Sequence, residues 1–324
     1  MNLISCRIKY PFHKISCSLF TVCLLLFVLS VSDAVVADET PQKNKPEIPT
    51  AIQKLTKQAV PLNRQKTLFL DAKEKCLYLQ GTVVLNAGLL EMLCCREQSK
   101  EHESIIAVNC KAFPIHTGLL ALKAKPGKPV SYDPEYQPPT GEKIAIIVIY
   151  VNKQGKLIQC DARQWVRTVT RRYFFTPLAR QPVDLTIPEK SDMKYDRRRR
   201  ELLYYGTMSL DELKKLQLLC EDKNYRKALK ELYQLSQPHL LKADWVFAGS
   251  LFQKDPQTGE QRYLAEGGDY ICVANFSSAM IDVAIPSSAS DANRGFEANS
   301  DLVPPPGTPV LLKLQRAVDS KEVK

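Results

Sequence analysis

Most of the chain after residue 61 consists of short apolar runs that alternate with polar segments. Aromatic and β-branched residues are enriched in these runs, which is typical of strands. Residues 144–151 (IAIIVIYV) are apolar or aromatic at every position. This pattern predicts a strand that is buried on both faces and lies in the centre of its sheet. We predict further strands over residues 66–71, 75–85, 88–95, 156–165, 201–205, 245–252, 261–268, 269–276, 280–285 and 310–314.

Helical patterns occur at two places between the predicted strands. Residues 114–125 begin with a proline, end before Pro126-Gly127 and carry leucines on one broad side, so a short helix is expected there. Ser209 and Glu212 form a capping box, and apolar residues then recur at helical spacing up to Pro238. The sequence therefore predicts an α+β fold, in which a mixed β-sheet core carries a short helix and an inserted amphipathic helix pair.

The N-terminus has the three parts of a secretory signal. Residues 1–14 contain basic side chains and no acid, residues 15–32 contain no charge, and Ala34 and Ala37 offer two cleavage positions. The alternative is an uncleaved anchor, since the charge-free run approaches the ~20 residues that span a bilayer. Either reading predicts an exported protein that is periplasmic, secreted or on the cell surface, with membrane contact only through an uncleaved N-terminal segment.

Composition changes along the chain indicate how the rest is organised. Proline and lysine dominate the segment after the leader, and a basic, helix-containing stretch separates the two strand-rich parts. The predicted divisions are a signal peptide or anchor at 1–37, a disordered linker at 38–61, one domain at 62–315 with an insertion at about 167–240, and a tail at 316–324.

Seven cysteines remain after the leader, and an odd number leaves at least one without an intramolecular partner. There is no C-x-x-C pair, so the spacing supports neither a redox motif, a ribbon-type zinc site nor an iron–sulfur cluster. Several of these cysteines lie within apolar strand patterns. The role expected for them is that of small buried hydrophobic side chains.

The net charge of +10 is concentrated in one region. Residues 167–200 hold ten Arg and Lys against four acids and end in the run Arg197, Arg198, Arg199, Arg200. Such a run can bind an anionic cell-envelope polymer, and export makes nucleic acid an unfavoured partner. The structural alternative is a solvated connector between two parts of the domain.

The residues that could carry chemistry are few. His102, Glu103 and Ser104 precede an apolar run, and His116 lies early in the short predicted helix. If residues 101–104 open a strand, His102 and Ser104 face one side while the two glutamates face the other. His102, Glu103 and His116 could then hold a divalent metal, or Ser104 could act as a nucleophile with a histidine base. The structural alternative is a half-buried histidine that bonds to a neighbouring carboxylate.

No complete catalytic signature surrounds these residues. His102-Glu103 does not continue into H-E-x-x-H, and G-x-S-x-G, S-x-x-K and G-x-G-x-x-G are all missing. The turn Glu266-Gly267-Gly268-Asp269 offers two acids to a cation but falls short of a calcium loop. No cofactor is therefore expected, apart from a divalent metal in the enzymatic alternative.

Several segments together resemble a known family. Residues 101–105 (EHESI), residues 116–127 (HTGLLALKAKPG), the WVF-x-GS segment that begins at Trp245, and Gly268-Asp269 are similar to the YdjY-domain family. The arginines at 167, 171 and 172 and the helical insertion resemble its exported planctomycete members. The resemblance covers roughly residues 62–315. It implies an exported or periplasmic protein and implies no particular reaction.

The sequence thus favours an exported cell-envelope protein that acts as a non-enzymatic module for a ligand or partner. One alternative is a metal-dependent, hydrolase-like enzyme that uses His102, Glu103 and His116. The other is binding of an anionic polymer through residues 167–200.

Overall fold

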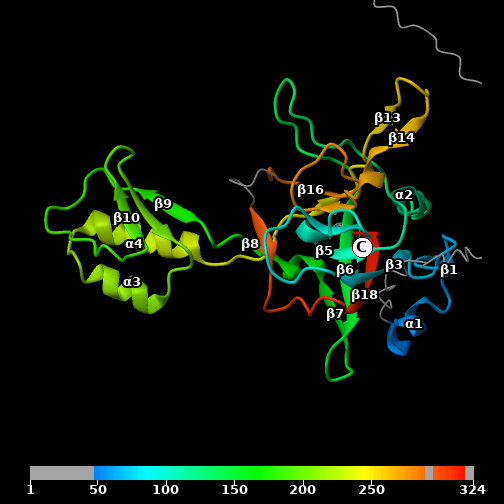
Figure 1. Cartoon of the computed structure of the whole chain (residues 1–324), viewed down its shortest axis with the longest axis horizontal. Coiled ribbons are helices and arrows are strands. Elements are labelled where there is room, and N and C mark those ends of the chain that lie inside the picture. The colour runs from blue at the N-terminus through cyan, green and yellow to red at the C-terminus, as the bar shows by residue number, and fades with distance from the viewer. Residues whose placement is uncertain (1–46, 289–294, 318–324) are drawn as a thin grey trace, which may run out of the picture. The chain divides into compact units, whose positions relative to one another are not determined.

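A mixed sheet of eleven strands forms the centre of the protein (Figure 1). The computed structural model describes residues 47–288 and 295–317, so the expected signal peptide and most of the tail lie outside the described residues. Strand order is β15-β4-β5-β3-β18-β6-β12-β16, with β2 joining β1 to β3 and β7 paired to β6. The strands are β1 (Val60–Pro61), β2 (Leu68–Asp71), β3 (Cys76–Val83), β4 (Met92–Arg96), β5 (Ser104–Val108), β6 (Lys143–Val151), β7 (Leu157–Asp161), β12 (Trp245–Val246), β15 (Ile271–Cys272), β16 (Asp282–Val283) and β18 (Pro309–Arg316).

Strands β3, β18 and β6 form the longest continuous pairing in this sheet. The late strand β18 lies between the two earlier ones, and Leu312 is aligned with Leu79 on one side and Val148 on the other. All the strand pairs except β4–β5 are antiparallel. The expectation that residues 144–151 form a strand inside the sheet is confirmed, since β6 pairs with β18 and with β7 and β12.

One face of the sheet is covered by α2 (Ala112–Ala121), the short helix expected from the sequence. Ile115 and Leu119 of this helix are fully buried in the main core. Gly118 allows the helix to come very close, because a Cβ at this position would lie 2.9 Å from both methyl carbons of Leu77. The α2–β3 contact therefore depends on the missing side chain at Gly118.

The opposite face is covered by a helix where the sequence predicted a disordered linker. Helix α1 (Thr50–Thr56) places Ile52, which is fully buried, against Tyr78, Ile149 and Leu311. Residues 60–61 of the same expected linker form β1. The linker prediction is thus wrong for residues 50–61, because Ile52 and Leu55, three positions apart, give this short helix an apolar side.

Two other expectations are corrected in detail. Residues 101–103 do not open a strand but form a 3₁₀ turn (Glu101–Glu103), which is closed by a hydrogen bond from Glu103 N–H to Lys100 O (3.2 Å). Gln98 N–H also donates to Glu101 Oε1 (2.7 Å). The polar stretch 286–309, for which the sequence predicted no strand, contains β17 (Phe296–Ala298), which pairs with β8 (Val166–Thr168). Residues 289–294 of that stretch lie outside the described residues. The remaining short elements are a β13 (Phe252–Lys254) and β14 (Gln261–Tyr263) hairpin and the 3₁₀ turns Ala162–Trp165 and Leu264–Gly267.

Residues 168–239 form an insertion, which we call the inserted lobe. The chain enters and leaves it side by side, since Thr168 N–H donates to His239 O (2.8 Å) and Arg167 pairs with Leu240. The lobe contains a three-stranded sheet in the order β10-β11-β9 and the helices α3 and α4 (Figure 1). These elements are β9 (Tyr173–Pro177), β10 (Met193–Asp196), β11 (Glu201–Tyr205), α3 (Leu210–Gln217) and α4 (Lys223–Ser236).

The sequence of the lobe explains its local structure. Ser209 Oγ accepts a hydrogen bond from Glu212 N–H (3.1 Å), as the capping box predicted, and Asp222 Oδ1 caps α4 through Tyr225 N–H (2.9 Å). The apolar sides of both helices and one face of the small sheet form a separate core that includes Leu202, Tyr225 and Leu229. The α+β class and the inserted helix pair are therefore confirmed.

The seven cysteines after the leader all carry free thiols, and six of them are buried. Burial raises the pKa of the Cys110 thiol to about 12 and keeps the pKa of Cys94 and Cys272 well above the usual range. They pack as small hydrophobic side chains, as expected. Within the described ranges, no helix is both long and apolar enough to cross a bilayer.

The separate core predicts that the inserted lobe can be weakened alone. Leu229→Ala removes a fully buried side chain from α4 and should destabilise the lobe by about 2–5 kcal/mol. Hydrogen exchange is the measurement, because amides of β9, β11 and α4 should exchange faster while those of β3, β18 and β6 keep their protection. Equal acceleration in both sets of strands would contradict a separate core.

Candidate functional site

The arginine run of the sequence forms the tip of the β10–β11 hairpin in the inserted lobe. Asp196 is paired with Glu201, so the four arginines between them make up the whole loop. Asp196 Oδ1 accepts hydrogen bonds from the backbone N–H groups of Arg198 (2.9 Å) and Arg199 (3.0 Å), and Arg200 adopts a left-handed conformation with φ 58°. The run is therefore a defined turn between two strands and not an extended connector, although its side chains are solvated as that alternative expected.

All four arginine side chains at this tip are exposed. None of them makes an ion pair with any residue that the structure describes. This differs from Arg163, Arg167 and Arg316, each of which is paired with carboxylates. The hairpin tip therefore concentrates four uncompensated positive charges on a short, hydrogen-bonded loop.

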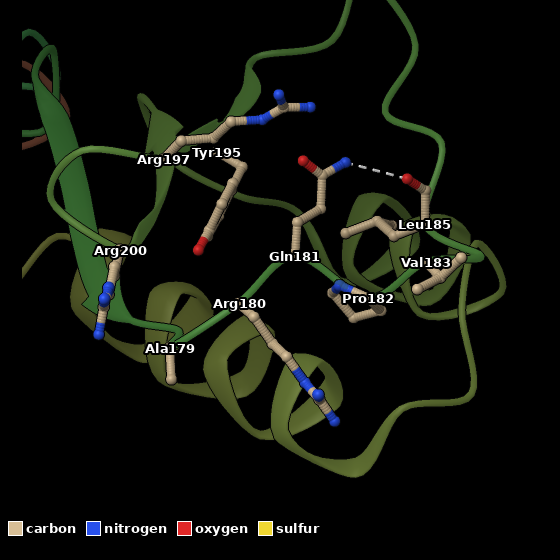
Figure 2. A pocket seen from close by; sticks show the side chains of 9 residues that line it. All are labelled: Ala179, Arg180, Gln181, Pro182, Val183, Leu185, Tyr195, Arg197 and Arg200. Atoms are coloured by element: carbon tan, nitrogen blue, oxygen red, sulfur yellow. Dashed lines mark hydrogen bonds between the residues drawn. The ribbon is translucent and has the colours of Figure 1, made fainter.

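A hollow of about 400 Å³ lies beside the hairpin and is rimmed by arginines (Figure 2). Arg197 and Arg200 come from the hairpin, and Arg180 comes from the segment that follows β9. The walls are held by hydrogen bonds, since Tyr195 O–H donates to Leu178 O (3.0 Å) and Gln181 Nε2 donates to Leu185 O (3.1 Å). The hollow is thus bounded by segments whose positions are held by hydrogen bonds.

The three guanidinium groups do not point to a common centre. In Figure 2 Arg197 extends beside Gln181, whereas Arg180 and Arg200 extend away from the hollow on different sides. A single small anion is bound best by donors that converge on it, as in a bidentate arginine clamp. Diverging guanidinium groups instead suit an extended ligand whose negative charges are distributed along its length.

The structure does not bring the candidate metal ligands together. His102 is largely exposed, and its Nε2 lies 3.7 Å from Glu103 Oε2, which is the one ion-pair contact of its ring. His116 lies in a different setting, between the aromatic rings of Phe247 and Tyr263. Among the described residues no group of three or more His, Cys, Asp or Glu side chains is arranged to hold a metal ion. The His102, Glu103 and His116 set therefore does not fit a metal, and we derive no step through one.

Ser104 and the two acids of the Glu266–Asp269 turn have partners within the protein. Ser104 is fully buried at the start of β5, and its hydroxyl donates to Ile106 O (3.1 Å). Glu266 Oε1 accepts from Phe113 N–H (3.0 Å) near the N-terminus of α2, where a carboxylate is favourable. Asp269 is paired with Lys100 Nζ (2.8 Å) and accepts from Ser278 Oγ (2.5 Å). The two acids thus hold α2 and the β4–β5 connection in place.

His116 lies at one end of a buried hydrogen-bond chain that runs through the Tyr263 hydroxyl to the Gly249 carbonyl. Tyr263 O–H donates to Gly249 O (3.1 Å), so the His116 Nδ1–H donates in turn to the Tyr263 oxygen (2.8 Å). Burial lowers the pKa of His116 below its usual value of 6.5. A neutral histidine enclosed by aromatic rings is the structural alternative that the sequence left open, although its partner is a tyrosine and not the expected carboxylate.

A second buried polar cluster, which is centred on Asp282, was not predicted from the sequence. Its carboxylate is fully buried and accepts from Val283 N–H (2.8 Å) and Asn275 Nδ2 (3.2 Å). Two tyrosines from the 131–137 turn cap Asn275, with Tyr132 O–H donating to its carbonyl oxygen (3.1 Å) and Tyr136 O–H to its Oδ1 (3.1 Å). Burial raises the pKa of Asp282 to about 7. A single acid inside an apolar strand pattern carries no signal that could have identified this cluster.

Comparison with known proteins adds no further constraint on the site. No protein-family model matches the chain, and neither a curated protein nor a solved structure matches it.

The Tyr263 hydroxyl should contribute to stability through two partners. Tyr263→Phe leaves the His116 Nδ1–H and the Gly249 carbonyl without this buried partner, so the free energy of unfolding should fall by about 1–3 kcal/mol. Urea unfolding measures this change. Tyr205→Phe is the matched control, because the Tyr205 side chain is 44% exposed. Loss of its hydroxyl should leave the free energy of unfolding nearly unchanged.

Asp282 should make stability depend on pH. Its pKa is about 7 in the folded protein against 3.8 for the free side chain, so the folded state holds the proton more tightly. The contribution of this tighter proton binding to the free energy of unfolding is fully present below pH 3.8 and is lost as pH rises through about 7. Unfolding should therefore be easier at pH 8 than at pH 5, and Asp282→Asn should flatten this difference. An unchanged slope in the variant would mean that Asp282 ionises normally.

Proposed function

We propose that this protein is an exported, non-enzymatic binding module whose arginine hairpin binds an anionic polymer of the cell envelope. The observation that carries the proposal is the hairpin tip of Arg197, Arg198, Arg199 and Arg200, whose charges have no ion-pair partner among the described residues. Four adjacent like charges repel one another, so a turn of this kind costs free energy in the unbound protein. A polyanion converts that repulsion into attraction and releases its own counterions.

The architecture supports binding over catalysis. Ser104 is fully buried in strand β5, and His116 is enclosed by aromatic rings. His102 is largely exposed, with Glu103 beside it. The arginine-rimmed hollow contains no histidine, cysteine, serine or carboxylate among its lining residues, and its one hydroxyl group, that of Tyr195, donates to Leu178 O. No specific observation favours the metal-dependent hydrolase alternative.

Export is the part of the proposal that rests on sequence alone. The basic segment, charge-free run and alanines of residues 1–37 have the form of a secretory leader. The resemblance to exported YdjY-domain proteins points to the same compartment. A protein outside the cytoplasm meets acidic polysaccharides and other envelope polyanions, whereas nucleic acid is not its physiological partner.

The hairpin should dominate retention on a polyanion. Replacing Arg197, Arg198, Arg199 and Arg200 by glutamine should lower the salt concentration that elutes the protein from immobilised dextran sulfate. The slope of log K against log salt should fall by about two to four, because each neutralised contact releases about one counterion.

The matched control removes the same number of charges from the helices of the same lobe. Lys214, Lys215, Lys223 and Lys230 are exposed on α3 and α4, and their replacement by glutamine leaves the hairpin unchanged. This variant should retain most of its affinity. An equal loss in both variants would show that net charge alone causes retention and would overturn the proposed site.

A further inference from the structure

The outer face of the small sheet in the inserted lobe is aromatic and open. Strand residues alternate in direction, and the inward side chains Thr176, Leu202 and Tyr204 are buried beneath α4. The outward rings at Tyr173, Phe175 and Tyr205 are 42%, 53% and 44% exposed. Single exposed aromatic side chains are common on a solvated sheet, but three on one small face form a patch that indicates a binding surface.

These rings form one continuous platform. Tyr205 is aligned with Tyr173 across the β11–β9 pair, and their ring centroids are 5.1 Å apart. Phe175 follows two residues along the same strand, opposite Leu203. We call Tyr173, Phe175, Leu203 and Tyr205 the aromatic platform. Along β11 from residue 205 to residue 203 it covers about 7 Å at the usual rise of a strand.

Cationic groups border the aromatic platform. Lys194 Nζ donates to Tyr173 O–H (3.2 Å) and lies 5.6 Å from the centre of that ring. At the other end of the same sheet, the β10–β11 hairpin carries its four unpaired arginines. The charge around this platform is therefore complementary to an anionic chain that runs along the strands from Lys194 to the hairpin tip.

We propose that the aromatic platform stacks the sugar rings of an acidic polysaccharide, a polyuronate, whose carboxylates reach Lys194 and the hairpin arginines. The C–H face of a pyranose ring carries partial positive charge, which the negative face of an aromatic ring attracts. This inference rests on the proposed function, since it specifies which polyanion the arginine hairpin binds.

The position of two acids favours a sugar over a chain of phosphates. Asp196 and Glu201 lie between the aromatic platform and the arginine tip and are aligned with each other. A phosphate backbone passing this point would meet their negative charge. A polyuronate also carries one carboxylate on each ring, but each ring has hydroxyl groups that can face the two acids and donate hydrogen bonds to them, which a polyphosphate chain lacks. Single-stranded nucleic acid also stacks on exposed rings, so the test must distinguish it from a polyuronate.

The test uses the full chain, two substitutions on the platform and three polyanions. Phe175→Thr with Tyr205→Thr removes two rings while keeping β-branched residues that suit a strand. Phe252→Thr is the control, because Phe252 is a 50% exposed aromatic residue in β13, outside the inserted lobe. Binding is measured by calorimetry with polygalacturonate, polyphosphate and oligo-dT, and circular dichroism checks that each variant is folded.

The double variant should bind polygalacturonate about tenfold more weakly, while polyphosphate binding, which uses charge alone, stays within about twofold. Unchanged polygalacturonate binding would overturn the sugar platform but leave the arginine proposal intact. A greater loss for oligo-dT than for polygalacturonate would assign the platform to nucleic acid instead. Failure of the unsubstituted protein to bind any of the three polymers would overturn the proposed function itself.

Discussion

The pairing of β18 with both β3 and β6 is the constraint on which the rest of the structure depends. The strands β15, β4, β5 and β3 lie on one side of β18, and β6, β12 and β16 lie on the other. The two halves meet along β18 through continuous antiparallel ladders. Its fully buried Leu312 and Leu311 belong to the cores on opposite faces, beneath α2 and α1 respectively. Both helices are therefore placed by one strand.

The inserted lobe carries the exposed arginines and aromatic rings, and its packing is separate from that of the eleven-stranded sheet. It has its own core, and the chain enters and leaves it through adjacent residues near Thr168 and His239. Charge repulsion at the arginine hairpin is therefore opposed by the packing of α4 against the small sheet, and not by the eleven-stranded sheet. A protein built in this way can concentrate cations and exposed rings in one lobe without introducing them into the main core.

Patterns of several residues predicted the structure well. The apolar run of β6, the capping box at Ser209 and the strand at 201–205 all appear in the structure where local physics placed them. The errors occurred where few residues carry the signal. Helix α1 has one turn of apolar spacing within a lysine- and proline-rich stretch, and β17 has three residues. Such elements form because the surrounding sheet supplies a surface to cover.

The candidate site was predictable only in part. The sequence identified Arg197–Arg200 as a basic run but not as a hairpin loop, because the pairing of β10 with β11 depends on tertiary packing. The aromatic platform could not be predicted for the same reason, since it combines side chains that are more than thirty positions apart in the sequence, such as Tyr173 and Tyr205. For His102 and His116 the opposite happened. Their closeness in the sequence suggested one shared site, but the fold places the two side chains in different environments.

The place of β18 in the order of synthesis also has a consequence for folding. Residues 309–316 follow every other described element, yet both β3 and β6 need them as a hydrogen-bonding neighbour. The central ladder has a high sequence separation, and such ladders form slowly. The nascent chain therefore lacks its central strand until residues 309–316 have been synthesised. Until then β3 and β6 each keep one edge without its hydrogen-bonding neighbour.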